Sequence, residues 1–70
     1  MLTVKTPKPY LVFADFPMFT AYAWKCEHKK YGIQTLGDTA EEAKKDFRDI
    51  IADELYFSGV VKTPEMVKVI

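Results

Sequence analysis

The tripeptide Cys26-Glu27-His28 holds the most reactive side-chain types in this sequence. In an extended strand, Cys26 and His28 share one face, because side chains alternate between the two faces. A structural zinc site normally takes four cysteine or histidine ligands, and this chain has one residue of each type. A Cys–His nucleophilic pair also needs a third group that orients the base, and the sequence supplies none. We therefore expect a half-buried thiol beside a loop histidine. We predict no catalytic residue, metal or cofactor, and the protein is predicted not to be an enzyme.

Carboxylates on the predicted helix are a second candidate for chemistry, because paired acidic side chains bind divalent cations. Asp46, Asp49 and Asp53 fall on adjoining helical turns. The basic residues interleaved with them are Lys44, Lys45 and Arg48. This pattern is typical of a solvated face of mixed charge, which is the interpretation we favour.

Three aromatic residues, Tyr22, Trp24 and Tyr31, could share an exposed sheet face. Such faces stack the bases of single-stranded nucleic acids, especially beside lysines. The nearby lysines are Lys25, Lys29 and Lys30. However, ten basic and ten acidic residues cancel, and the glycine and aromatic spacing of an RRM is missing, which argues against nucleic acid. We favour Tyr22, Trp24 and Tyr31 as candidate interface residues packed against another protein subunit.

Three strands are predicted to position these side chains. They cover residues 10–14, 19–27 and 31–36. Pro17 cannot donate to a strand ladder, so we expect a turn at residues 15–18. The short connections predict an antiparallel meander, and residues 1–8 are expected to be a lead without regular structure.

One amphipathic helix is predicted over residues 40–57. Thr39 is its predicted N-cap, and Glu42, three residues later, is expected to bond back to it in a capping box. Gly59 is expected to end the helix in the left-handed conformation. The apolar stripe of the helix is predicted to consist of Ala43, Phe47, Ile50, Ile51 and Leu55.

The last residues allow two interpretations. Residues 66–70 form a possible strand, or Thr63 caps a short helix that has Pro64 at its first position. We prefer the strand because Val67, Val69 and Ile70 are β-branched.

The predicted fold class is α+β. A three- or four-stranded, mainly antiparallel sheet carries one long helix on one face, in the order β-β-β-α-β, as a single domain over residues 1–70. Ala21 and Ala23 leave room for a closely packed helix, so we expect the helix on their side. Tyr22 and Trp24 then lie on the uncovered face as a patch too apolar for a monomer, which predicts a homodimer.

Residues 28–51 resemble the HicB-like antitoxin family, in which a strand ends in a Gly-Asp-Thr corner followed by Glu-Glu-Ala and an amphipathic helix. The matching residues are Gly37, Asp38, Thr39, Glu41, Glu42 and Ala43. Gly32 falls where the family has a glycine before this corner. The resemblance implies a domain that neutralises a small RNA-cleaving toxin, so such a toxin is a candidate partner. The family's usual C-terminal DNA-binding module has no counterpart here, so we expect a stand-alone domain that does not repress its own operon.

Composition agrees with a small intracellular domain. Cys26 is the single cysteine, which excludes an internal disulfide and suits a reducing compartment. No apolar run reaches transmembrane length and the first eight residues lack a signal-peptide core, so we expect a cytoplasmic protein with no membrane partner.

The function expected from these observations is protein–protein interaction by a self-associating HicB-like domain. The alternative is a small module that binds single-stranded nucleic acid through the sheet aromatics. The two are distinguished by whether Tyr22 and Trp24 are buried against protein or exposed beside lysines.

Overall fold

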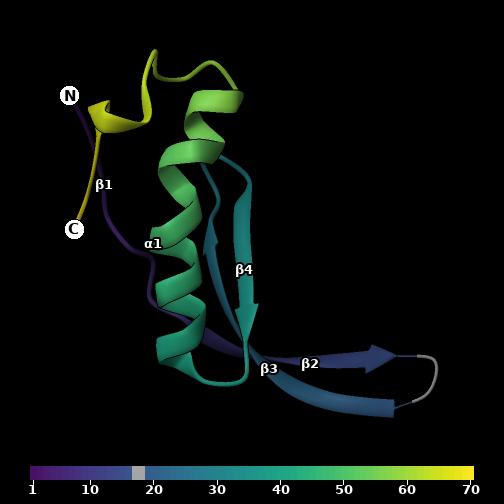
Figure 1. Cartoon of the computed structure of the whole chain (residues 1–70). Coiled ribbons are helices and arrows are strands. Elements are labelled where there is room, and N and C mark those ends of the chain that lie inside the picture. The colour runs from purple at the N-terminus through teal and green to yellow at the C-terminus, as the bar shows by residue number, and fades with distance from the viewer. Residues whose placement is uncertain (17–18) are drawn as a thin grey trace.

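The fold combines a three-stranded antiparallel sheet, a small parallel sheet and one long helix (Figure 1). The predicted α+β class, antiparallel sheet and helix are confirmed, whereas the parallel sheet was not predicted. The computed structural model describes residues 1–16 and 19–70, and the side chains of all but residues 14–20. The elements are β1 (Leu2–Val4), β2 (Tyr10–Phe16), β3 (Phe19–His28), β4 (Ile33–Gly37), α1 (Ala40–Phe57), a 3₁₀ turn (Pro64–Met66) and β5 (Val67–Val69). Within the described residues, no helix has the length and hydrophobicity that crossing a bilayer requires.

The small parallel sheet joins the two ends of the chain. Strand β1 pairs with β5, with Leu2 opposite Val67 and Val4 opposite Val69. In Figure 1 this pair lies on the other side of α1 from β4. Strand β5 was predicted from the sequence. Strand β1 was missed, because residues 1–8 were expected to lack regular structure and a three-residue strand has too little periodicity to recognise. Both interpretations of the tail are partly realised, since a short 3₁₀ turn begins at Pro64 and the strand follows it.

The start of α1 is fixed by side-chain caps, and its predicted bounds are confirmed. The backbone N–H of Glu42 donates to Thr39 Oγ1 over 3.1 Å. Glu42 Oε2 accepts from the backbone N–H of Asp38 at 3.1 Å, not from Thr39, so the reciprocal bond is displaced by one residue from the predicted capping box. The helix start also packs closely on β4, because a Cβ atom added at Gly37 would lie 2.7 Å from the backbone nitrogen of Ala43.

The end of α1 is a Schellman motif. Gly59 follows the helix with φ 82°, the left-handed conformation predicted for it. Its N–H donates to the Tyr56 carbonyl at 3.1 Å, and the Val60 N–H donates to the Leu55 carbonyl at 2.9 Å. These two bonds satisfy carbonyl groups that the end of a helix otherwise leaves unpaired.

The core forms where α1 packs on β3 and β4. Four of the five predicted stripe residues are fully buried, whereas Ile50 is only partly buried. Val4, Cys26 and Val61 complete the core from β1, β3 and the segment after the helix. The Thr35 hydroxyl of β4 donates to the Ala43 carbonyl at 2.7 Å and ties the sheet to the helix. The buried stripe residues are Ala43, Phe47, Ile51 and Leu55.

The prediction that α1 packs on the Ala21 and Ala23 side of β3 is wrong. Cys26, on the opposite face, is fully buried in the core, and Trp24 packs against the core from the same face. The reason lies in the register of the sheet: β4 pairs only with residues 24–28 of β3. Ala21 and Ala23 therefore lie beyond the end of β4, where their size has no bearing on how closely the helix packs.

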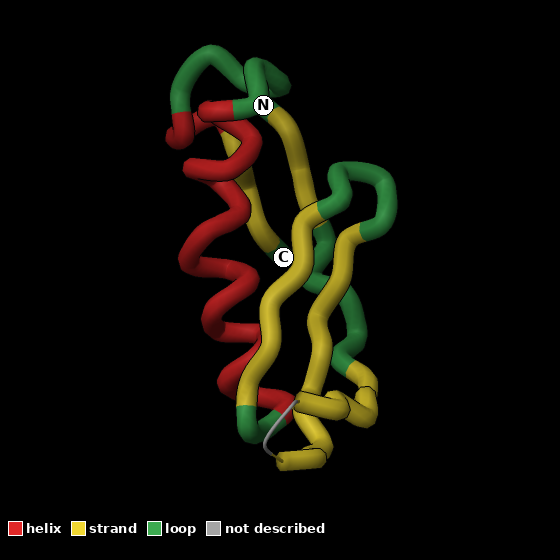
Figure 2. Tube along the Cα trace, turned by 90° about the vertical axis from the view of Figure 1, so that its right-hand side faces the viewer, coloured by secondary structure: helices red, strands yellow, loops and turns green. Residues whose placement is uncertain are grey.

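On the N-terminal side of residue 24, β3 pairs with β2 alone, and these parts of the two strands form a two-stranded ribbon. We call residues 12–16 and 19–23 the hairpin arm, because they pair only with each other. Figure 1 shows the arm extending away from α1, and it points toward the viewer in Figure 2. The arm makes the molecule elongated, with extents of 41 × 21 × 17 Å. Of the turn predicted at residues 15–18, residues 15 and 16 belong to β2, and residues 17 and 18 lie outside the described residues.

Candidate interaction surface

Large apolar side chains are exposed along one face of the hairpin. In an antiparallel pair, directly opposed residues point to the same face, and β2 places Leu11 opposite Trp24 and Phe13 opposite Tyr22. Leu11, Phe13 and Tyr22 are 51%, 58% and 67% exposed. We call Leu11, Phe13 and Tyr22 the arm patch. It continues the helix-facing side of the sheet past the point where α1 covers it.

Aromatic packing organises the patch. The rings of Phe13 and Tyr22 meet edge to face, with centroids 5.3 Å apart. This favourable arrangement holds both rings at the surface. A two-stranded hairpin without further support is only marginally stable in water. Burying the arm patch against a partner therefore stabilises the arm more than it stabilises the core.

The three aromatics predicted as one interface do not lie together. Tyr22 is exposed on the arm, whereas Trp24 is partly buried against the core. Tyr31 is not in a strand as predicted, because β4 begins at Ile33. It lies in the turn at the opposite end of β3, packs against the core and stacks on His28 with ring centroids 4.8 Å apart.

Leu11 and Phe13 were missed as candidate interface residues. Both lie in β2, which is apolar on both faces, so the sequence of this strand does not show which of its faces another element covers. The signal that identifies them is the register of the hairpin, which aligns them with Trp24 and Tyr22.

Cys26 is more deeply buried than the predicted half-buried thiol, and it is held by the backbone. Its Sγ donates to the Pro7 carbonyl at 3.3 Å. Burial raises the pKa of the Cys26 thiol from its ordinary value of 9.0, and the positive charges of Lys44 and Arg48 oppose this shift only in part. The thiolate, which is the nucleophile and metal ligand, is therefore disfavoured at neutral pH.

The neighbours of Cys26 do not form a reactive group with it. Glu27 lies on the other face of β3, where its Oε1 accepts from the Tyr10 hydroxyl at 3.1 Å. Desolvation raises the pKa of Tyr10, and the hydrogen bond and charge of Glu27 add to this effect. His28 is the last residue of β3, not a loop residue, and its buried Nδ1 has no hydrogen-bond partner among the described residues. No group of three potential ligands that could hold a metal ion occurs among the residues that the structure describes.

The exposed side of α1 has the mixed charge that the sequence indicated. Asp46, Asp49 and Asp53 are all exposed. Lys45 Nζ lies 3.2 Å from Asp49 Oδ2, and Lys44 Nζ lies 3.2 Å from Glu41 Oε1. Exposed pairs of this kind add little to stability, so we read this face as solvated.

Comparisons with models of known protein families, with curated proteins and with solved structures find no match to this chain.

Proposed function

We propose that this protein is a protein–protein interaction module that forms a homodimer through the arm patch, in the manner of a HicB-like antitoxin domain. The observation that supports this most strongly is the exposure of Phe13 and Tyr22 on the arm and of Leu11 directly next to it. Contiguous exposed apolar side chains on a small protein usually mark a site of association.

A second copy of the chain is the occupant that best fits the patch. A two-fold axis brings the same surface of both copies together, so each arm covers the other without any further component. Full burial of a Leu or Phe side chain is worth about 1.5–3 kcal/mol. The aromatic pair Phe13 and Tyr22 is also of the type that dominates the binding energy of interfaces.

The HicB-like part of the proposal is supported by the Gly-Asp-Thr corner and the strand order around it. Thr39 caps α1 and Gly37 lets the helix start pack on β4, so the residues behind the resemblance have a structural role here. A small RNA-cleaving toxin is the partner this proposal implies, and the single buried cysteine fits the cytoplasm as its location.

Co-expression with a toxin encoded beside this protein's gene should restore growth if the proposal is right, and unrelieved growth arrest would contradict it.

Stacking of nucleic-acid bases on Tyr22 and Trp24 is a weaker proposal. Trp24 is partly covered by the core, which leaves Tyr22 as the exposed ring of the two. Lys25 lies on the opposite face of β3, since it is opposed by Tyr10 and Leu36. Lys25 is therefore not beside the Tyr22 ring, as such a platform needs.

Sedimentation equilibrium at micromolar concentration tests the homodimer. We expect the wild-type chain to be a dimer and the Phe13→Asp or Tyr22→Asp variant to be a folded monomer, because each buries an unpaired charge in the interface. Trp24→Asp is a poorer probe, since it also disturbs the core.

The matched control is Phe57→Asp, which introduces the same charge at an aromatic residue that is 79% exposed at the end of α1. This variant should remain a dimer. A monomeric wild-type chain, or equal dissociation of the Phe57→Asp variant, would overturn the arm patch as the interface.

A further inference from the structure

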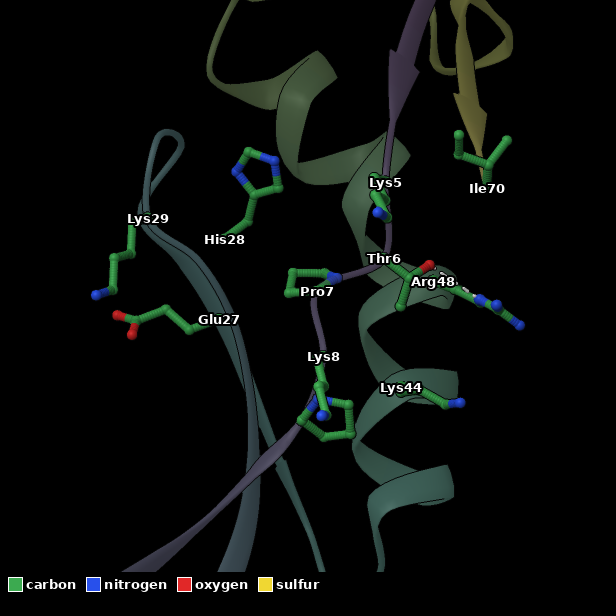
Figure 3. A pocket seen from close by; sticks show the side chains of 11 residues that line it. Lys5, Thr6, Pro7, Lys8, Glu27, His28, Lys29, Lys44, Arg48 and Ile70 are labelled. Atoms are coloured by element: carbon green, nitrogen blue, oxygen red, sulfur yellow. Dashed lines mark hydrogen bonds between the residues drawn. The ribbon is translucent and has the colours of Figure 1, made fainter.

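A groove of about 670 Å³ lies beside the extended segment that links β1 to β2. It is bordered by residues 5–9, by the end of β3 and by α1 (Figure 3). It shares no residue with the arm patch, so what it binds is independent of the proposed homodimer. Its charged lining residues are Lys5, Lys8, Glu27, Lys29, Lys44 and Arg48.

The groove concentrates positive charge. Five of the ten basic residues of the chain line it, against one of the nine acidic residues whose side chains are described. The net charge of zero therefore conceals a strong separation of charge over the surface. A net charge of zero therefore does not disfavour a polyanionic ligand on this face.

The positive charges remain available to a ligand. Lys5, Lys8 and Lys29 are exposed, and no ion pair involves them among the described residues. Arg48 donates through Nε to Thr6 Oγ1 at 3.0 Å, which orients the side chain and leaves its terminal nitrogens free to contact an anion. Lys44 has Glu41 as a partner, and that pair is partly solvated.

The cations are spread along the groove and do not converge on one point. Figure 3 shows Lys44 and Arg48 on one side of the segment that bears Lys5 and Lys8, with Lys29 on the other side. One small anion could not contact all of these side chains. An extended chain of negative charges could contact several at once.

The backbone of the groove disfavours an acidic peptide as the ligand. Extended peptides usually bind a sheet edge through main-chain hydrogen bonds. Pro7 and Pro9 have no N–H, and the N–H of Thr6 already donates to the Ile70 carbonyl at 2.7 Å. Lysine ammonium groups need no such ladder, because they bind phosphate as mobile point charges.

We propose that this groove binds the phosphodiester backbone of a nucleic acid without reading its sequence. The aromatic side chain of His28, which lines the groove, packs on Tyr31 and beside Phe47, so it is not free to stack on a base. Contacts to phosphate alone give affinity that depends on salt and not on base sequence.

Fluorescence anisotropy with a labelled uridine homopolymer and with a short labelled DNA duplex tests this proposal. Both probes should bind at low salt, and affinity should fall as salt rises from about 50 to 200 mM, with a log–log slope of about −0.9 per duplex phosphate contact. Tighter binding of one probe identifies whether single strands or duplexes supply the phosphates. Failure of both probes to bind at low salt would overturn the proposal.

The decisive variants are two charge reversals of equal size. Lys5→Glu with Lys8→Glu should weaken binding at least about tenfold and make the salt slope shallower by about 2, one for each lost contact. The control, Lys62→Glu with Lys68→Glu, changes two exposed lysines outside the groove lining and should leave the slope unchanged. If the first pair reduces thermal stability, Lys8→Ala with Lys29→Ala serves in its place.

Two results would contradict the inference. Equal loss in both variant pairs would show that total charge, not the groove, controls binding. Tighter binding of polyglutamate than of either nucleic acid would show that the groove accepts acidic peptides instead.

Discussion

The two halves of strand β3 share one sequence pattern and have different environments. Residues 24–28 pair with β4, and the face of this half that carries Trp24 and Cys26 is covered by α1, so Cys26 is completely buried. Residues 19–23 pair with β2 alone, and Tyr22, two positions from Trp24 on the same face, is mostly exposed. Alternation along a strand thus assigns side chains to a face, whereas the neighbouring elements decide whether that face is covered.

The largest contrast between the two halves should appear when an aromatic ring is truncated. Phe47→Ala removes a fully buried side chain facing β3 and should lower the free energy of unfolding by about 3–5 kcal/mol. Phe13→Ala, in the arm, should lower the stability of the monomer by less than about 1 kcal/mol, because the ring is already solvated. Chemical denaturation of both variants at low protein concentration measures the difference, and equal losses would show that the arm is packed as tightly as the core.

A smaller effect is expected where β4 meets the helix. Gly37→Ala places a Cβ atom 2.7 Å from the backbone nitrogen of Ala43, so the start of α1 must shift. We expect a loss of about 1–3 kcal/mol, as for other overpacked sites. Gly32→Ala is a useful comparison, because no described residue other than its chain neighbours has an atom within 4 Å of the added Cβ, and only its positive φ is strained. An unchanged melting temperature for Gly37→Ala would contradict the close packing of this junction.

The N-cap of α1 should contribute less to the free energy of unfolding than the close packing at Gly37. Thr39→Ala removes the hydroxyl that accepts from the Glu42 N–H and should cost about 1 kcal/mol. Thr39→Ser keeps the oxygen and should stay close to the wild type. If urea denaturation shows no loss for the alanine variant, the helix does not depend on this cap.

The smallest expected effect is a pH dependence from Cys26. Because burial raises the pKa of its thiol, the folded state holds the proton more tightly than the unfolded state. The resulting stability is fully present below the ordinary pKa of 9.0 and is lost as the pH rises through the folded-state value. Cys26→Ala lacks this group, so the wild-type chain should lose more stability than the variant between neutral and alkaline pH. Parallel alkaline denaturation curves for the two proteins would contradict the raised pKa.

The helix could be predicted from sequence because its signals are local. Strand β1 and the side on which α1 packs could not, because they depend on pairing between distant segments. Thr39 and Gly59 mark the ends of α1 through bonds to residues three to five positions away, so a short window contains the information. Strand β1 depends on residues 67–69, at the other end of the chain. The side on which α1 packs depends on how far β4 extends along β3, which no single strand encodes.

The candidate sites divide in the same way. Tyr22 could be identified as an exposed aromatic from its own strand, whereas Leu11 and Phe13 required the register between β2 and β3. The basic groove could not be predicted, because its cations come from the segment between β1 and β2, the turn after β3 and the helix. Only the folded chain brings those three segments together.

Amide hydrogen exchange at low and high protein concentration tests the central claim, that the arm is completed by a second copy. We expect arm amides to exchange rapidly in dilute protein and to become protected at concentrations where the dimer forms. Amides in the middle of α1 should be protected equally in both, because the core does not depend on association. Arm amides whose protection is the same at every concentration, strong or weak, would contradict the claim that a second copy covers the arm patch.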